Sequence, residues 1–403
     1  MGRASAESNA PSTLDGSTAP GPPSRAARGL CCALALAGLG AAPADAAPAR
    51  VEVAPPNAPL PALAQPPWPQ LAAVFPGVLV HGSGTLLQGR TLTTQRLLLL
   101  EGASLLAILV GGLVIYETGA ARDLAGPAVL TVAAGVGAFS SSLLANVYAA
   151  WSPPEGLGEP RRRLPPLVSG IGYTYVGSPQ FDDHHFMTAH VDGRLEGWHL
   201  GVDATISPSP GHELLSARGG YRLVGPRAAR EPARDGTYLE PQIGFSSERL
   251  DRYGFVTRTL EVQVDGRLDA DRWLPDVRGA FFQGAVGLAR QWIEFDVPGA
   301  NAMDTSELLI LHSGFGVYLG ARSAPGLEHG AALPGGELEL YYDHRRDGLA
   351  GGIQTLGPSS GFAGHVGLRG EYYANEAWGL RLLIERGSAW VLGSSVLFRT
   401  GLP

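Results

Sequence analysis

The sequence is poor in cysteine, lysine and charged residues. It holds two cysteines in 403 residues and no lysine, so every basic side chain apart from histidine is arginine. Charged residues make up 17% of the chain, which is low for a soluble protein of this size, whereas glycine is frequent, with 56 residues. The formal net charge of −7 argues against nucleic acid as a partner, because such proteins present a basic face.

Both cysteines fall in a segment that resembles a secretory signal peptide. Cys31 and Cys32 open an apolar run that follows two arginines and precedes Ala44-Asp45-Ala46. A basic region, an apolar run and an Ala-x-Ala site predict export with cleavage after Ala46. We therefore assign residues 1–46 to a signal peptide with an N-terminal extension. A mature chain without cysteine would have no disulfide, cysteine metal site or thiol nucleophile.

The next two segments differ sharply in composition. Residues 47–70 are rich in proline and alanine and are predicted to be a disordered, extended spacer. Residues 71–152 contain two apolar runs, Leu97 to Tyr116 and Leu124 to Ala150, each long enough to cross a bilayer. The short link between them predicts an antiparallel helical hairpin of membrane type, packed through small residues.

In residues 160–403, apolar and polar residues alternate as in the strands of a β-barrel. The alternation is clearest from Val256 to Leu268. There Leu260, Val262 and Val264 share one face, whereas Glu261 and Asp265 lie on the other. Many such runs separated by turns predict an all-β transmembrane barrel of about 12 antiparallel strands, with ten or fourteen left open. The predicted strands lie near 167–176, 186–195, 197–207, 212–224, 237–247, 254–268, 277–292, 306–320, 335–345, 361–373, 376–386 and 389–399.

From Leu164 to Thr400 the chain resembles the bacterial outer-membrane β-barrel class. The resemblance rests on strand rhythm and on aromatic residues near strand ends, such as Trp198 and Trp390, and not on a sequence motif. It implies location in the cell outer membrane, contact with membrane lipid and insertion by the outer-membrane insertion machinery. Members of the class usually end in an aromatic residue, whereas here Phe398 lies five residues before the end.

The inward face of the predicted barrel carries charges of both signs. Long arginine and glutamate side chains could pair across so narrow a bore. A small-solute channel and an occluded structural barrel are therefore equally compatible with the sequence. The polar face predicts the following lumen-lining residues: Arg218, Arg222, Glu240, Glu261, Asp265, Arg267, Glu337, Glu339, His365, Arg369, Glu371, Arg381 and Glu385.

Possible catalytic and metal-binding residues do not form a convincing set. The residue types of an omptin-like protease occur in Asp182 to His185 together with the pair Asp343-His344, and those of an outer-membrane phospholipase occur in the pair His312-Ser313. Adjacent strand residues point to opposite faces, so neither pair can share the lumen. A metal site is only weakly indicated and rests on four consecutive residues: Asp182, Asp183, His184 and His185. We assign no catalytic residue and no cofactor.

Two alternatives remain at the level of sequence. In the first, the two helices anchor the protein in the inner membrane and the β-region is a periplasmic sandwich or incomplete barrel. In the second, the barrel is an outer-membrane hydrolase.

Overall fold

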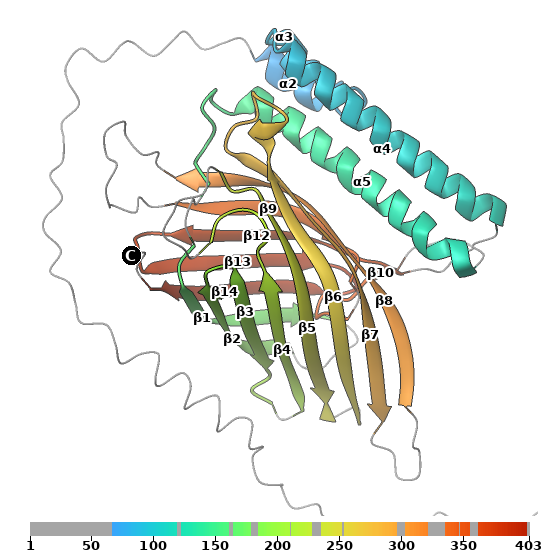
Figure 1. Cartoon of the computed structure of the whole chain (residues 1–403), viewed down its shortest axis with the longest axis vertical. Coiled ribbons are helices and arrows are strands. Elements are labelled where there is room, and N and C mark those ends of the chain that lie inside the picture. Colours follow the sequence, from blue (N-terminus) through green and yellow to red (C-terminus); the bar gives the residue numbers. More distant parts are fainter. Residues whose placement is uncertain are drawn as a thin grey trace, which may run out of the picture. The chain divides into compact units, whose positions relative to one another are not determined.

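The computed structural model describes eleven stretches of the chain (Figure 1). These are residues 67–118, 122–160, 164–178, 184–209, 211–227, 235–251, 254–295, 303–320, 335–345, 347–354 and 362–400. The predicted signal peptide and the spacer up to residue 66 lie outside the described residues. So do Asp182 and Asp183 of the weakly indicated metal site.

Among the described residues, two short and two long helices precede the barrel. They are α2 (Trp68–Val74), α3 (Ser83–Leu87), α4 (Thr91–Thr118) and α5 (Arg122–Trp151). The long helices are both apolar and long enough to cross a membrane. Their backbones approach closely at two glycines: an added Cβ would lie 2.8 Å from the Ala128 carbonyl oxygen at Gly111, and 2.8 Å from that of Ser104 at Gly135. The predicted hairpin is confirmed.

The short helices close one end of the hairpin around a buried polar group. Glu101 of α4 is 7% exposed, and its Oε2 accepts a hydrogen bond of 2.9 Å from the backbone N–H of His81. The His81 ring is fully buried and lies 4.5 Å from the ring of Phe139, measured between centroids. Neither short helix was predicted, because their sequence is broken by glycine and proline.

Twelve antiparallel strands form a closed barrel, as predicted. The order around the barrel is β1-β14-β13-β12-β9-β8-β7-β6-β5-β4-β3-β2. Each barrel strand therefore pairs with the barrel strand that follows it in the chain, and β14 pairs with β1 to close the barrel. A two-residue pairing of β10 (Ile353–Gln354) with β11 (Phe362–Ala363) was not predicted. Closure rules out the sandwich or incomplete barrel of the inner-membrane alternative. The barrel strands are β1 (Leu167–Gly177), β2 (His185–Leu195), β3 (Trp198–Ile206), β4 (His212–Tyr221), β5 (Tyr238–Leu250), β6 (Phe255–Asp269), β7 (Ala280–Phe295), β8 (Met303–Gly320), β9 (Gly335–Asp343), β12 (His365–Tyr373), β13 (Trp378–Arg386) and β14 (Trp390–Arg399).

The outer wall of the barrel is apolar and exposed. Leu260, Val262 and Val264 of β6 are 42%, 58% and 41% exposed, whereas Thr259 on the other face is 2% exposed. This is the predicted alternation, with apolar side chains outward. We call the end of the barrel where β1 begins and β14 ends the terminal end, and the opposite end the loop end.

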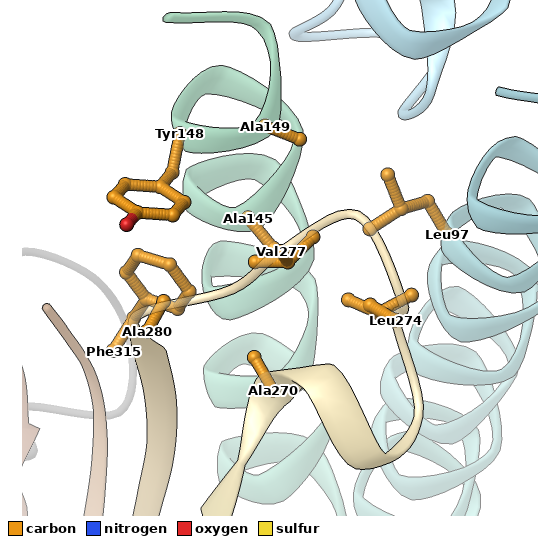
Figure 2. Packing of buried hydrophobic residues seen from close by; sticks show 9 residues of the cluster. All are labelled: Leu97, Ala145, Tyr148, Ala149, Ala270, Leu274, Val277, Ala280 and Phe315. Atoms are coloured by element: carbon orange, nitrogen blue, oxygen red, sulfur yellow. The ribbon is translucent and has the colours of Figure 1, made fainter. Parts of the chain in front are cut away.

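The hairpin packs against the outside of the barrel near the terminal end (Figure 2). Tyr148 of α5 faces Phe315 of β8, with ring centroids 6.1 Å apart, and its hydroxyl donates a 2.7 Å hydrogen bond to the carbonyl of Arg278. From α4, Thr93 donates to Asp276 at 2.5 Å, and Arg96 donates to the carbonyl of Trp273. Arg96 therefore binds the barrel and does not pair with Glu101.

A charged barrel interior

The deepest carboxylate of the interior lies toward the terminal end. Glu240 of β5 is 1% exposed and accepts three hydrogen bonds of 2.8 Å, from Arg222 Nε, His199 Nδ1 and Gln242 Nε2. His199 Nε2 lies 3.0 Å from Asp192 Oδ1, so the imidazole bridges two carboxylates. Hydrogen bonds to charged groups are about twice as strong as neutral ones, and this cluster joins β2, β3 and β5 to Arg222, the residue that follows β4.

Farther around the barrel, an arginine joins two strands that are distant in sequence. Arg267 of β6 contacts both carboxylate oxygens of Glu337 of β9, at 2.7 and 3.1 Å. Its guanidinium also donates to Gln283 at 2.9 Å and lies 3.9 Å from the ring centroid of Phe281. The fork of the guanidinium matches a carboxylate in two places, so this contact orients both side chains.

A second buried carboxylate, Glu339 of β9, links the middle of the interior to the loop end. It is 2% exposed and accepts from Arg369 at 2.6 Å and from His312 Nε2 at 3.1 Å. His312 Nδ1 lies 3.5 Å from Asp343. As expected from strand alternation, Ser313 does not join this group, and an added Cβ at Gly137 of the hairpin would lie 2.3 Å from its hydroxyl oxygen.

At the loop end, a segment after β9 enters the mouth of the barrel. We call residues 344–345 and 347–351 the inner loop. Arg345 contacts Glu261 at 2.7 Å and Asp347 at 3.0 Å. Burial alone would lower the pKa of Arg345, but the hydrogen bond and charge of Asp347 and the charge of Glu261 raise it. Ala350 is 1% exposed.

Ala350 packs in an apolar cluster at the same mouth. The cluster consists of Ala350 with Val176, Phe186, Ala389 and Val391, each at most 2% exposed. The inner loop is thus held in two ways, by ion pairs at Arg345 and by apolar burial at Ala350.

Two cavities of the described interior, each lined in part by charged side chains, meet at the inner loop. The inner cavity, of about 350 Å³, is lined from Leu164 and Pro165 at the terminal end to His312. The outer cavity, of about 250 Å³, is bounded by residues 347–350. Both are lined by Arg218, Asp343 and Arg345, which form the boundary between them.

The predicted lumen residues lie around these cavities. The inner cavity is lined by nine of them, Arg218, Arg222, Glu240, Asp265, Arg267, Glu337, Arg369, Glu371 and Arg381. The outer cavity is lined by Arg218 again and by three more, Glu261, His365 and Glu385. Glu339 is buried against Arg369 and His312.

Sequence reasoning missed several members of the interior. Asp192, His199, His312 and Asp343 lie on inward faces of strands and could have been found by extending the alternation used for the other strands. Arg345 shares the alternating face of Glu337 and Glu339 within the predicted strand 335–345 and could have been found in the same way, although β9 itself ends at Asp343.

The histidines of the weakly indicated metal site have other partners. His184 Nδ1 lies 2.8 Å from the carbonyl oxygen of Val176, and His185 contacts the hydroxyl of Tyr173. Across the described stretches, no group of three or more His, Cys, Asp or Glu side chains could hold a metal ion.

A closed antiparallel barrel with a charged interior and an apolar outer wall is the architecture of the outer-membrane β-barrel class, and the chain has this fold. No protein-family model and no curated protein matches the sequence. Among solved structures, the chain is similar to the outer membrane protein Omp33 of Acinetobacter baumannii, with 10% identity over 59% of this chain and 98% of that one and a TM-score of 0.29. It is also similar to the β domain of the Bordetella autotransporter BrkA (13% identity, 58% and 99% covered, TM-score 0.31). A third similar structure is the translocator domain of the autotransporter NalP from Neisseria meningitidis, with 11% identity over 58% of this chain and 88% of that one and a TM-score of 0.30.

Proposed function

We propose that the protein is a narrow outer-membrane channel for small solutes, held closed by the inner loop, with the terminal end of the barrel toward the periplasm. The observation that carries this proposal is the pair of cavities that meet at Arg218, Asp343 and Arg345. A barrel built only as a structural element has no need of unfilled space lined by charged side chains on both sides of such a boundary.

The size of the cavities limits the solutes. A water molecule takes about 30 Å³ in the liquid, so the inner cavity of about 350 Å³ has the volume of roughly a dozen waters. Ions with part of their hydration shell and solutes of a few heavy atoms fit this space, whereas oligosaccharides and peptides do not.

The charge of the outer cavity favours cations. It is lined by four carboxylates, Glu261, Asp343, Asp347 and Glu385, against the two arginines of the boundary. The inner cavity, by contrast, is lined by seven arginines and six carboxylates. A cation therefore meets a favourable potential at the outer cavity and a nearly balanced interior beyond it.

Conductance across a planar lipid bilayer tests the proposal. The double variant Arg345→Ser/Ala350→Asp removes the ion pairs of the inner loop and places a charge in its apolar cluster. We expect no resolved current steps from the wild-type protein and discrete, cation-selective steps from the double variant.

Arg249→Ser is the matched control. Arg249 lies at the same end of the barrel and pairs with Asp251, with side chains 51% and 61% exposed, so its loss leaves the inner loop in place. A double variant as silent as the control would contradict the channel and favour the occluded structural barrel.

A further inference from the structure

A mostly apolar groove of about 530 Å³ lies between the helical hairpin and the outer wall of the barrel. Leu100 of α4 and Ala138 of α5 line it from the hairpin, and residues of β5 to β8 line it from the wall. Trp273, in the turn between β6 and β7, also lines it and packs against the hydrophobic cluster that joins the hairpin to the barrel. The groove is therefore continuous with the established contact between helices and strands.

The floor of the groove is a row of small residues that crosses three strands. Gly266 of β6 pairs directly with Gly284 of β7, and Gly284 pairs with Ser313 of β8. Directly opposed residues of antiparallel strands share a face. Gly266 also pairs with Leu239, which is 42% exposed on the outer wall, so the whole row faces outward.

Neither glycine is required by the fold of the barrel. An added Cβ would lie 3.4 Å from its nearest atom at Gly266 and 3.5 Å at Gly284, both ordinary contact distances. Neither residue has the positive φ that would favour glycine. The backbone would accept a side chain at both positions. The effect of the two glycines is therefore to leave the groove unfilled.

We propose that one acyl chain of a membrane glycerophospholipid occupies this groove. The strands that form its floor belong to the exposed apolar wall, where Val264 and Val286 are 41% and 45% exposed, so the groove opens to the hydrocarbon of the bilayer. An apolar cavity of about 150 Å³ accommodates benzene, and by this scale a groove of about 530 Å³ holds on the order of twenty carbon atoms. That is the size of one lipid chain, and it is too little for a further helix, which is about 10 Å across.

The consequence is a lipid that joins the hairpin to the barrel. Lipid hydrocarbon replaces the contacts that an empty groove would forfeit. The hairpin then crosses the same bilayer as the strands, and the inference does not depend on whether the barrel interior conducts.

Native mass spectrometry of the purified full-length protein after detergent exchange tests this assignment. We expect the wild-type protein to keep one glycerophospholipid, identified by its mass. Gly284→Leu fills the floor of the groove and should reduce the lipid-bound fraction at least fivefold. The matched control is Gly370→Leu on β12, where Gly370 pairs with the outward-facing Leu382 and an added Cβ would lie 3.2 Å from the end of the Leu338 side chain and 3.8 Å from the nearest backbone atom. It should keep the lipid.

Ala138→Leu fills the groove from the hairpin and serves as a second variant if the glycine substitution prevents folding. It should lose the lipid as Gly284→Leu does. Wild-type protein that carries detergent only, or equal lipid retention in the filled variants and the control, would overturn the proposal.

Discussion

The substitution Glu240→Gln measures how strongly the charged interior stabilises the barrel. A carboxamide has one oxygen and one amino group, whereas Glu240 accepts from Arg222 on one oxygen and from His199 and Gln242 on the other. In the Glu240→Gln variant, the amino group of the carboxamide therefore faces a nitrogen that donates to Glu240 in the wild-type protein. The loss of a charge-assisted hydrogen bond costs about 1.5–3 kcal/mol, and breaking a buried ion pair costs about 3–5 kcal/mol.

The side chains of Arg222 and Glu240 are 11% and 1% exposed, which places this pair near the buried limit, and we expect a loss of about 3 kcal/mol. With a urea dependence of about 3 kcal/mol per molar, the unfolding midpoint should fall by about 1 M. The midpoint can be followed in detergent by the change in gel mobility between folded and unfolded barrel.

Glu294→Gln makes the same chemical change on an exposed pair. Glu294 and its partner Arg258 are 43% and 44% exposed, and such pairs contribute at most about 1 kcal/mol. Equal small shifts for the two variants would refute the argument, because they would mean that the interior screens charge as bulk water does.

Two further predictions concern the helices. Burial lowers the pKa of His81 below 6.5, although the charge of Glu101 opposes this shift. The folded state therefore binds fewer protons than the unfolded state, and the stability of the fold decreases as the pH drops through 6.5. His81→Phe should remove that dependence, as measured by thermal loss of the helical circular dichroism signal at pH values of about 5.5 and 7.5; an unchanged pH dependence would contradict it. Tyr148→Phe removes a donor to Arg278 and an acceptor for the Leu157 N–H, so docking of the hairpin should weaken by about 1–2 kcal/mol. Faster proteolysis at residues 152–160 is expected, and a rate equal to wild type would contradict it.

The strands were predictable because each faces two contrasting environments. Most barrel strands alternate between an apolar outward face and a polar inward face, and that signal is local. The start of β12 shifts by four residues, from the predicted 361 to His365, and that of β7 by three, from 277 to Ala280. The preceding turn carries Leu274 and Val277, both fully buried against the hairpin, and their apolar character imitates a strand.

The pairing of charges could not be predicted in the same way. Arg267 and Glu337 are 70 residues apart, and their contact depends on the registers of β6 to β9 together. Arg345 follows the last residue of β9, so its ion pairs with Glu261 and Asp347 depend on the course of the inner loop and not on the register of a strand. The position of the hairpin could not be predicted either, because a helix face suited to lipid is equally suited to the outer wall of a barrel.

Accessibility of a single cysteine in the inner cavity tests the closed channel most directly. Ala285 lines that cavity, carries no charge and can be replaced by cysteine in a chain whose Cys31 and Cys32 are changed to alanine. A charged thiol reagent added outside intact cells should leave Ala285→Cys unmodified in the otherwise wild-type protein. The same cysteine should react once Arg345→Ser and Ala350→Asp release the inner loop. Equal modification with and without the release would contradict closure by the inner loop, and no modification in either would contradict the channel.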